Sequence, residues 1–291
     1  MFAVSDPSPE ESPDARAEQP RVLGDRYEVI RVLGEGSSAC TLLCSDLHDE
    51  RRVAVKELHF EHLDNWKYLE LFEREAKVLS LLDHHGIPKV LDYFQARSSS
   101  TTLYIVQEFI DGASLTQRME SGPLLGEQEV YDLALGLLDV LECLHGRAPP
   151  VYHRDIKPSN VLIRPNGDAA LVDFGGVCFG WRPPSHAGTT VVGTFGYMPP
   201  EQLLGQGGPT ADLYSLGATL LHLVTGRPPN EFPFDSGRIE VPTDLPTRDS
   251  LTRLMEALLH PAPRDRPQTA AAARVRFGGA LPSWLVADRG L

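Results

Sequence analysis

Short apolar runs separated by turn residues fill the chain from Tyr27 to about residue 110. The stretches YEVIRVLGEGSSACTLLCSD and RRVAVKEL have the β-branched and apolar content of successive antiparallel strands, and KVLDYFQA and TTLYIVQEFI continue the pattern. One segment among them, WKYLELFEREAKVLSLLDHH, repeats its apolar residues at helical spacing until glycine and proline end the run. This part of the chain therefore predicts a small sheet with one amphipathic helix.

Helical patterns dominate after Asp111 and Gly112. The segments GEQEVYDLALGLLDVLECLHG and ADLYSLGATLLHLVTG are long, strongly apolar and nearly free of breakers, which predicts two largely buried helices. The change in pattern divides the chain into a strand-rich lobe, residues 25–110, and a helix-rich lobe, residues 111–276. We therefore expect an α+β fold.

The two ends of the chain differ from this body. Residues 1–24 are rich in Pro, Ser, Glu and Asp and have too little apolar surface to offset the entropy of ordering, which predicts a flexible acidic tail. Residues 277–291 form a C-terminal extension, and its Trp284, Leu285 and Val286 predict that it packs against the larger lobe.

Composition and charge exclude several classes of protein. A chain of 291 residues with 42% hydrophobic and 23% charged residues is typical of a globular protein with a real core. Its net charge of -13 argues against nucleic acid as a partner, because proteins that bind it need a basic patch. The four cysteines lack C-x-x-C spacing and predict neither a zinc site nor a disulfide framework.

The distribution of apolar residues also bears on location. The longest apolar runs, such as Leu133–Leu144, contain acidic residues and fall short of the roughly 20 residues that span a bilayer. The N-terminus lacks a basic region followed by an apolar one, the pattern of a secretory signal. We expect no membrane span and a cytoplasmic protein.

Three features of the strand-rich lobe have ordinary explanations when taken singly. The sequence GEGSSA, Gly34–Ala39, lies between two predicted strands, so it is neither a dinucleotide-binding fingerprint nor an ATPase phosphate loop, and a plain turn is a sufficient reading. Lys56, at the end of VAVK, is explained equally well as a charge at a strand edge. Glu75 is explained as a solvated charge on a helix.

Two stretches of the helix-rich lobe change this picture. HRDIKPSN, which contains Asp155 and Asn160, precedes a short apolar run, and Asp173-Phe174-Gly175 follows another. Phosphoryl transfer needs a proton acceptor and two metal ligands that converge on one triphosphate, and these residues are of the types required. Their presence in this order indicates an enzyme that acts on a nucleotide.

In motif order and spacing, residues 27–275 resemble the protein kinase family, and in particular its eukaryotic-like serine/threonine branch of bacterial type. The resemblance implies a bilobal fold, with an antiparallel β-rich N-lobe that binds ATP and a mostly α-helical C-lobe that binds the protein substrate. It implies transfer of the γ-phosphoryl group of ATP to serine and threonine hydroxyls, those of the chain itself included. It also implies Mg²⁺, or Mn²⁺, as the metal.

The resemblance also implies roles for individual residues. Lys56 would contact the α- and β-phosphates and Glu75 would hold that lysine in place. Asp173 and Asn160 would bind the metal ions. Asp155 would orient the substrate hydroxyl and accept its proton.

Further residues complete the implied catalytic apparatus. Lys157 would neutralise charge on the migrating phosphoryl group, and Thr194 would bond the catalytic aspartate and this lysine, as in the serine/threonine branch. Glu201 would form a structural ion pair with Arg266. Asp212 would support the catalytic loop.

The adenine would lie where the chain joins the lobes, against the backbone of Glu108 and Ile110, with Gln107 at the back of the site. The remaining nucleotide-binding candidates are Gly34, Glu35, Gly36, Thr41, Ala54 and Leu162. Ala39 replaces the usual third glycine of the loop and Thr41 the usual valine, and we expect both to weaken ATP binding without abolishing it.

Regulation and two alternative functions complete the expectations. Arg154 precedes the catalytic aspartate, and the resemblance implies that it pairs with a phosphorylated residue, for which Thr189 and Thr190 are the best candidates and Ser185 the next. A transient dimer would serve trans-autophosphorylation. A catalytically inactive scaffold and a small-molecule phosphotransferase of the same fold remain alternatives.

Overall fold

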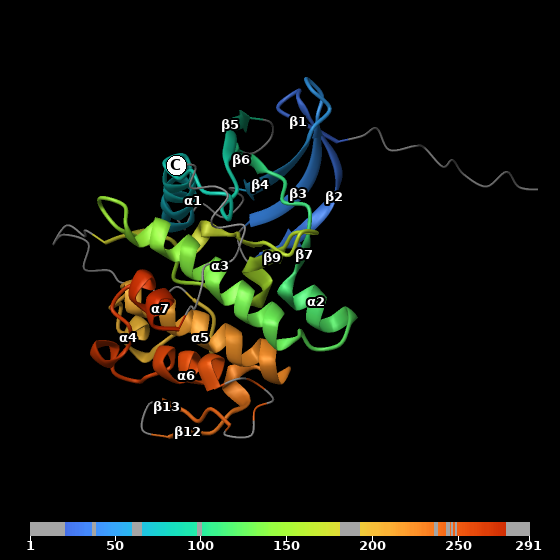
Figure 1. Cartoon of the computed structure of the whole chain (residues 1–291). Coiled ribbons are helices and arrows are strands. Elements are labelled where there is room, and N and C mark those ends of the chain that lie inside the picture. The colour runs from blue at the N-terminus through green and yellow to red at the C-terminus, as the bar shows by residue number, and fades with distance from the viewer. Residues whose placement is uncertain are drawn as a thin grey trace, which may run out of the picture.

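The computed structural model describes residues 21–36, 39–59, 66–97, 101–180, 193–235, 238–242, 245, 247 and 249–277. A strand-rich lobe lies above a larger helix-rich lobe (Figure 1). This is the bilobal α+β arrangement that the sequence predicts.

The N-lobe contains one antiparallel sheet of six strands in the order β1-β2-β3-β4-β6-β5. The strands are β1 Val22–Leu23, β2 Tyr27–Glu35, β3 Ala39–Asp46, β4 Arg52–His59, β5 Val90–Arg97 and β6 Thr101–Glu108. Helix α1, Trp66–Leu79, connects β4 to β5, which places β5 at the edge of the sheet beside β6. The strands and the helix predicted for this region are all present.

Alternation along β4 separates two faces of this sheet. Val53 and Val55 belong to an apolar cluster on one face, which also contains Leu23 and Tyr27. Leu58 belongs to a second cluster, together with Phe72 and Ala76 of α1. Lys56 has the same parity as Leu58, so the strand directs this lysine toward the α1 side.

The N-lobe begins earlier than the sequence predicts. Val22–Leu23, assigned above to a flexible tail, pairs with β2, and Leu23 is only 4% exposed. Two apolar residues beside a polar segment are a weak local signal, and the burial of Leu23 depends on a sheet built by later residues. The rest of the predicted tail, residues 1–20, lies outside the described chain, as do residues 278–291 with Trp284.

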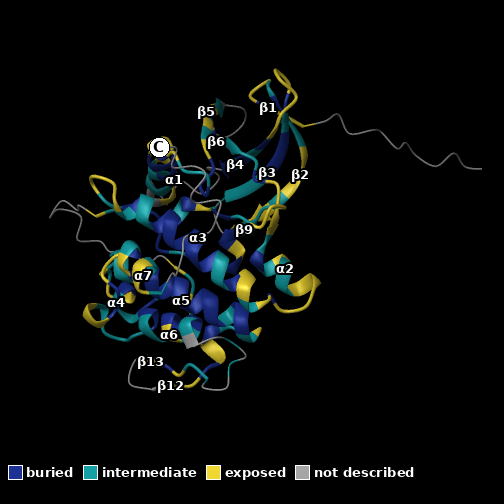
Figure 2. Cartoon of the chain, in the orientation of Figure 1, coloured by how far each residue is buried: buried dark blue, intermediate teal, exposed yellow. Residues whose placement is uncertain are grey.

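Helices form most of the C-lobe. They are α2 Leu115–Ser121, α3 Glu127–His145, α4 Pro200–Leu203, α5 Pro209–Thr225, α6 Asp249–Leu258 and α7 Ala270–Phe277. Helices α3 and α5 form its interior (Figure 2), which explains why their sequences are apolar on nearly every side. None of the described helices is long and apolar enough to cross a membrane.

The C-lobe also contains short strands, and those after α3 position the charged motifs. They are β7 Ala113–Ser114, β8 Val151–Tyr152, β9 Val161–Ile163, β10 Ala169–Leu171 and β11 Cys178–Phe179, while β12 Phe234–Asp235 and β13 Arg238–Ile239 form a separate hairpin. The loop from His153 to Asn160 lies between β8 and β9, and Asp173 follows β10. The amide N–H of Val172 donates to the carbonyl of Asn160 at 2.8 Å, which holds the two motifs side by side.

Candidate active site

Lys56 lies between two carboxylates from different parts of the chain. Its Nζ donates to both oxygens of Glu75 on α1, at 2.8 and 2.6 Å, and to Oδ1 of Asp173 at 2.7 Å. Glu75 is almost completely buried. Burial disfavours the charged lysine, but the two carboxylates outweigh it and raise the pKa of Lys56, so the lysine is a permanent cation.

The backbone at Asp173 is shaped to present its carboxylate. This residue has φ of +61°, in the left-handed region, and the carboxylate accepts the amide N–H of Gly175. The adjacent Lys56 ammonium lowers the pKa of Asp173 to about 2. A Cβ on Gly175 would lie 3.2 Å from Oδ1 of Asp173 and 3.3 Å from Nζ of Lys56, so glycine is the residue that leaves room for this contact.

The second group of charged residues surrounds Asp155. Thr194 donates its hydroxyl to Oδ1 of Asp155 at 2.7 Å and accepts from Nζ of Lys157 at 2.7 Å. The lysine also lies 2.9 Å from Oδ2 of the aspartate. Both hydrogen bonds that the resemblance implies for Thr194 are therefore present, and they join Thr194 to a residue 39 positions away, in the loop from His153 to Asn160.

Asn160 is oriented by its contacts with Asp155. Its Nδ2 donates to the backbone carbonyl of Asp155 at 2.8 Å and to Oδ2 of the same residue at 3.1 Å, so both N–H groups of the amide have acceptors. The amide oxygen could therefore serve as a metal ligand, and the hydroxyl of Ser159 donates to it at 3.3 Å. An amide oxygen here and the carboxylate of Asp173 form an oxygen donor set that suits Mg²⁺ or Mn²⁺.

Asp212 of α5 supports the catalytic loop from inside the C-lobe. It is fully buried and accepts the amide N–H groups of His153 at 2.9 Å and Arg154 at 2.7 Å. Arg154 has φ of +71°, a strained conformation that these bonds help to maintain. Burial would raise the pKa of Asp212, but the donors, with His145 first among them, lower it. The charge stays on the carboxylate and fixes the loop that carries Asp155.

Two side chains in this support escaped the sequence reasoning. His145, the last residue of α3, places Nε2 2.9 Å from Oδ2 of Asp212. Gln202 of α4 is completely buried and donates from Nε2 to the carbonyl of Arg154 at 2.7 Å. A histidine that ends a long apolar helix was the available signal for the first, and nothing in the local pattern marked the second.

The structural ion pair expected of Glu201 is present. Nη1 and Nη2 of Arg266 contact its two carboxylate oxygens, the latter at 3.2 Å. The arginine is buried, donates to the carbonyls of His260 and Pro261, and lies over the ring of Tyr214. The pair holds α4, and with it the chain that follows Thr194, against the C-lobe.

The nucleotide-binding candidates lie on neighbouring strands. Thr41 of β3 pairs with both Gly34 of β2 and Lys56 of β4, while Ala54 pairs with Gln107 of β6. Glu35 lies opposite Cys40, and Gly36 donates its N–H to the carbonyl of Ala39 at 2.8 Å, which closes the glycine-rich turn. Ile110 is buried, and Leu162 lies on β9 in the other lobe, paired with Ser114.

The side chain of Glu108 takes no part in the expected adenine contact, which involves the backbone. Its carboxylate lies 3.8 Å from Arg164, and the residue lines a surface cavity of about 480 Å³. Only its backbone is left for the edge that adenine would need. The candidate phosphorylation sites Thr189 and Thr190 lie outside the described residues.

Comparison with known proteins matches residues 27–277 to the protein kinase domain. The chain belongs to the protein kinase family. This kinase is 39% identical over 224 residues to the serine/threonine-protein kinase PknA of Nostoc sp., and the alignment covers 72% of the chain and 39% of that relative. It is 31% identical over 215 residues to PrkC of Bacillus subtilis, covering 73% of the chain and 32% of the relative.

A third relative matches over more of the kinase. The PknA protein of Mycobacterium tuberculosis is 33% identical over 287 residues, covering 90% of the chain and 65% of that protein. All three relatives are named as serine/threonine-protein kinases, and the chain spans about a third to two thirds of their lengths. The fold and the family are thus settled by the sequence match and the bilobal structure together.

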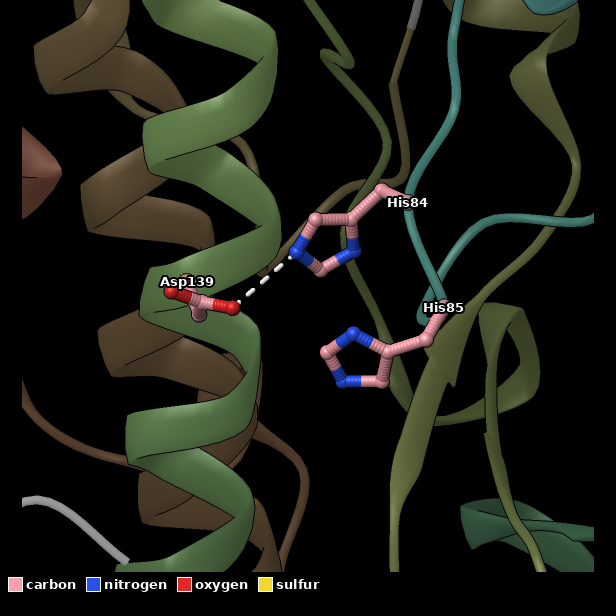
Figure 3. Close-up of side chains that lie close together, drawn as sticks. All are labelled: His84, His85 and Asp139. Carbon is pink, nitrogen blue, oxygen red and sulfur yellow. Dashed lines mark hydrogen bonds and ion pairs between the residues drawn. The ribbon is translucent and has the colours of Figure 1, made fainter. Parts of the chain in front are cut away.

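A further polar cluster of the kinase lies away from the phosphotransfer residues. His84 and His85, in the loop after α1, and Asp139 of α3 offer ligand atoms within 4.8 Å of one another (Figure 3). Gly86 donates its N–H to Nδ1 of His84 at 3.1 Å, so in the neutral ring the proton is on Nε2, which lies 3.0 Å from Asp139. A metal at Nε2 would have to displace this proton.

The cluster is therefore explained as a tether and not as a metal centre. Arg274 of α7 donates to Oδ1 of Asp139 at 2.6 Å while His84 occupies Oδ2. Burial would raise the pKa of Asp139, but His84 and Arg274 outweigh it and lower it. The charged aspartate links the loop that follows α1 to α3 and α7.

Proposed function

We propose that this chain is an ATP-dependent protein kinase that transfers the γ-phosphoryl group of ATP to serine and threonine hydroxyls of protein substrates. The observation that supports this most strongly is the closed network of Asp155, Lys157, Asn160 and Thr194. A second charged group, Lys56 with Glu75 and Asp173, is joined to that network through the Val172–Asn160 backbone bond.

Asp155 would act on the substrate hydroxyl. Its side chain is held by three donors, from Thr194, Lys157 and Asn160, so the position of the carboxylate is set before a substrate arrives. Oriented in this way, it would align the hydroxyl with the γ-phosphorus and accept its proton as the bond forms. Lys157 would stabilise charge on the group in transfer, because its ammonium lies beside the same carboxylate.

Lys56, Asp173 and Asn160 would hold the nucleotide and its metal ions. When bound, ATP with Mg²⁺ or Mn²⁺ supplies the phosphoryl group and neutralises its charge. The ammonium of Lys56, anchored by buried Glu75, would bind the α- and β-phosphates. Asp173 and the oxygen of Asn160 would bind the metal.

Thr194 and Lys157 also support the assignment to serine and threonine as acceptors. The hydroxyl of Thr194 bridges Asp155 and Lys157. The chain that follows Thr194 is held in place by the ion pair of Glu201 with Arg266. The relatives compared above are named as serine/threonine-protein kinases, which favours the same acceptor class.

The experiment that tests this function measures transfer of radiolabelled phosphate from ATP to a generic protein and, separately, to small hydroxyl compounds. We expect label on protein serine and threonine, and a decrease of roughly 10²- to 10⁴-fold in Asp155→Asn because the base and aligning group are lost. Asp132→Asn is the matched control, since this residue of α3 accepts a hydrogen bond from Gln128, one turn earlier on the same helix, and is not one of the residues proposed to act in transfer.

Two results would contradict the proposal. The first is an Asp155→Asn variant as active as Asp132→Asn. The second is label that appears on small hydroxyl compounds and never on protein. Mass spectrometry of the same samples addresses autophosphorylation, which we propose to occur in a transient dimer at Thr189 or Thr190, and unmodified threonines in an active sample would refute these sites.

A further inference from the structure

The chain from Arg21 to Tyr27 is held against the N-lobe sheet by packing and by ion pairs. Leu23 enters the apolar cluster on the sheet face opposite α1, and Arg26 makes a bidentate contact with Asp46 at 2.8 and 2.7 Å. Gly24, at φ of +55°, turns the chain against the ring of Phe94, where a Cβ would lie 2.6 Å away. This segment is part of the sheet's packing.

Arg21, at the start of this segment, contacts a buried carboxylate. Its Nη2 donates to Oε1 of Glu57, which also accepts the hydroxyl of Tyr104 at 3.0 Å. Glu57 is 1% exposed, whereas the side chain of Arg21 is about half exposed, at 51%. The arginine thus covers a charge that lies under the surface of the sheet.

Glu57 occupies a position that matters for nucleotide binding. It follows Lys56 directly on β4, and because side chains alternate along a strand, the two residues point to opposite faces of the sheet. Across the strands, Glu57 pairs with Cys40, which in turn pairs with Glu35 of the glycine-rich turn. One row of the sheet therefore joins Glu57 to that turn, and the residue before Glu57 on β4 is Lys56, the proposed ATP-binding lysine.

Arg21 is a positive charge beside a row of the sheet that contains two carboxylates, those of Glu35 and Glu57. Burial raises the pKa of the Cys40 thiol, the carboxylates of Glu35 and Glu57 raise it further, and Arg21 opposes them. A buried carboxylate that loses one of its cationic or hydrogen-bonding partners is less well compensated, and it responds by recruiting water, taking up a proton or moving. Any of these responses would disturb the pairing of β3 with β4 at the end that holds the phosphates.

We propose that Arg21 is a positioning residue for the ATP site, acting through Glu57 on the strands that carry the glycine-rich turn and Lys56. The inference rests on the proposed function, and it concerns nucleotide binding and not the transfer of the proton by Asp155. The effect belongs to the KM for ATP, while kcat and the KM for the protein substrate are left nearly unchanged.

The test compares full-length variants in two measurements, steady-state kinetics and calorimetric binding of Mg²⁺-ATP. We expect Arg21→Ala to raise the KM and the Kd for ATP about 3- to 10-fold, with kcat within about 2-fold of the unaltered protein. The KM and Kd for ATP of Arg21→Lys should lie between those of Arg21→Ala and the unaltered protein. The double variant Arg21→Ala with Glu57→Gln removes the buried charge and should restore ATP affinity to within about 2-fold.

Arg52→Ala is the matched control, because it removes the same charge from an exposed position at the start of β4. The inference fails if Arg21→Ala binds ATP as Arg52→Ala does, or if the double variant binds ATP as weakly as the single one. It also fails if only kcat decreases. If the unaltered chain bound ATP but transferred no phosphate, the proposed function would fail while calorimetry still decided the role of Arg21.

Discussion

Lys56 contacts carboxylates 19 and 117 positions away in the chain, and this residue shows why single motifs were weak predictors. A lysine at a strand end is ordinary in isolation. Its function follows only when Glu75 and Asp173 converge on one ammonium. The same holds for Asp155, which acquires its orientation from Thr194 and Asn160.

The pH dependence of stability should report the contact of Lys56 with Asp173. The pKa of Asp173 falls from 3.8 to about 2 on folding, so its contribution to stability is complete above about pH 4 and is lost as the pH falls toward 2. We expect Asp173→Asn to be less stable than the unaltered protein near neutral pH and the two to converge in acid. Thermal unfolding across this range measures it, and a difference that does not vary with pH would contradict it.

At the scale of elements, the position of α1 depends on a loop that is tied to the C-lobe. Glu75 reaches Lys56 from α1, and the loop after this helix is held to α3 through His84 and Asp139. The sequence predicted α1 from its periodicity and did not predict the tether, because the two partners are 55 positions apart.

Substitution of the aspartate tests this tether. Asp139→Asn removes the charge that both His84 and Arg274 face and should lower the free energy of unfolding by about 1–3 kcal/mol. Asp132→Asn, two helical turns earlier on α3, is the control and should change the free energy of unfolding by less than about 0.5 kcal/mol. Urea denaturation measures both, and equal stability of the two variants would show that the tether is unimportant.

At the scale of the whole molecule, the two lobes are stabilised by different apolar cores. A sheet with an apolar cluster on each face builds the N-lobe, whereas the C-lobe packs around α3 and α5, with residues after α1 sharing its core. Arg266 joins α4 to the chain before α7 and is therefore central to the C-lobe.

Two arginines of the same short segment allow a matched test of that role. Arg266→Ala leaves Glu201 without its cation and should destabilise the protein by about 3–5 kcal/mol, because one partner of a buried pair remains. Arg264→Ala removes a side chain that is 88% exposed and should lower the free energy of unfolding by less than about 0.5 kcal/mol. Chemical denaturation of both variants decides it, and similar midpoints would refute a structural role for the pair.

The sequence by itself determined the family, the bilobal fold, the strands β2 to β6, the helices α1, α3 and α5, and the residue types of the site. It could do so because periodicity is local and because the order of the motifs is written along the chain. Only the tertiary structure decided which charges meet: Arg21 with Glu57, His84 with Asp139, and Gln202 with the backbone of Arg154. These contacts join segments 36 to 55 positions apart, where no local pattern records the partner. Val22–Leu23 pairs with nearby residues of β2, but the cluster that buries Leu23 also contains distant residues such as Val53 and Tyr104.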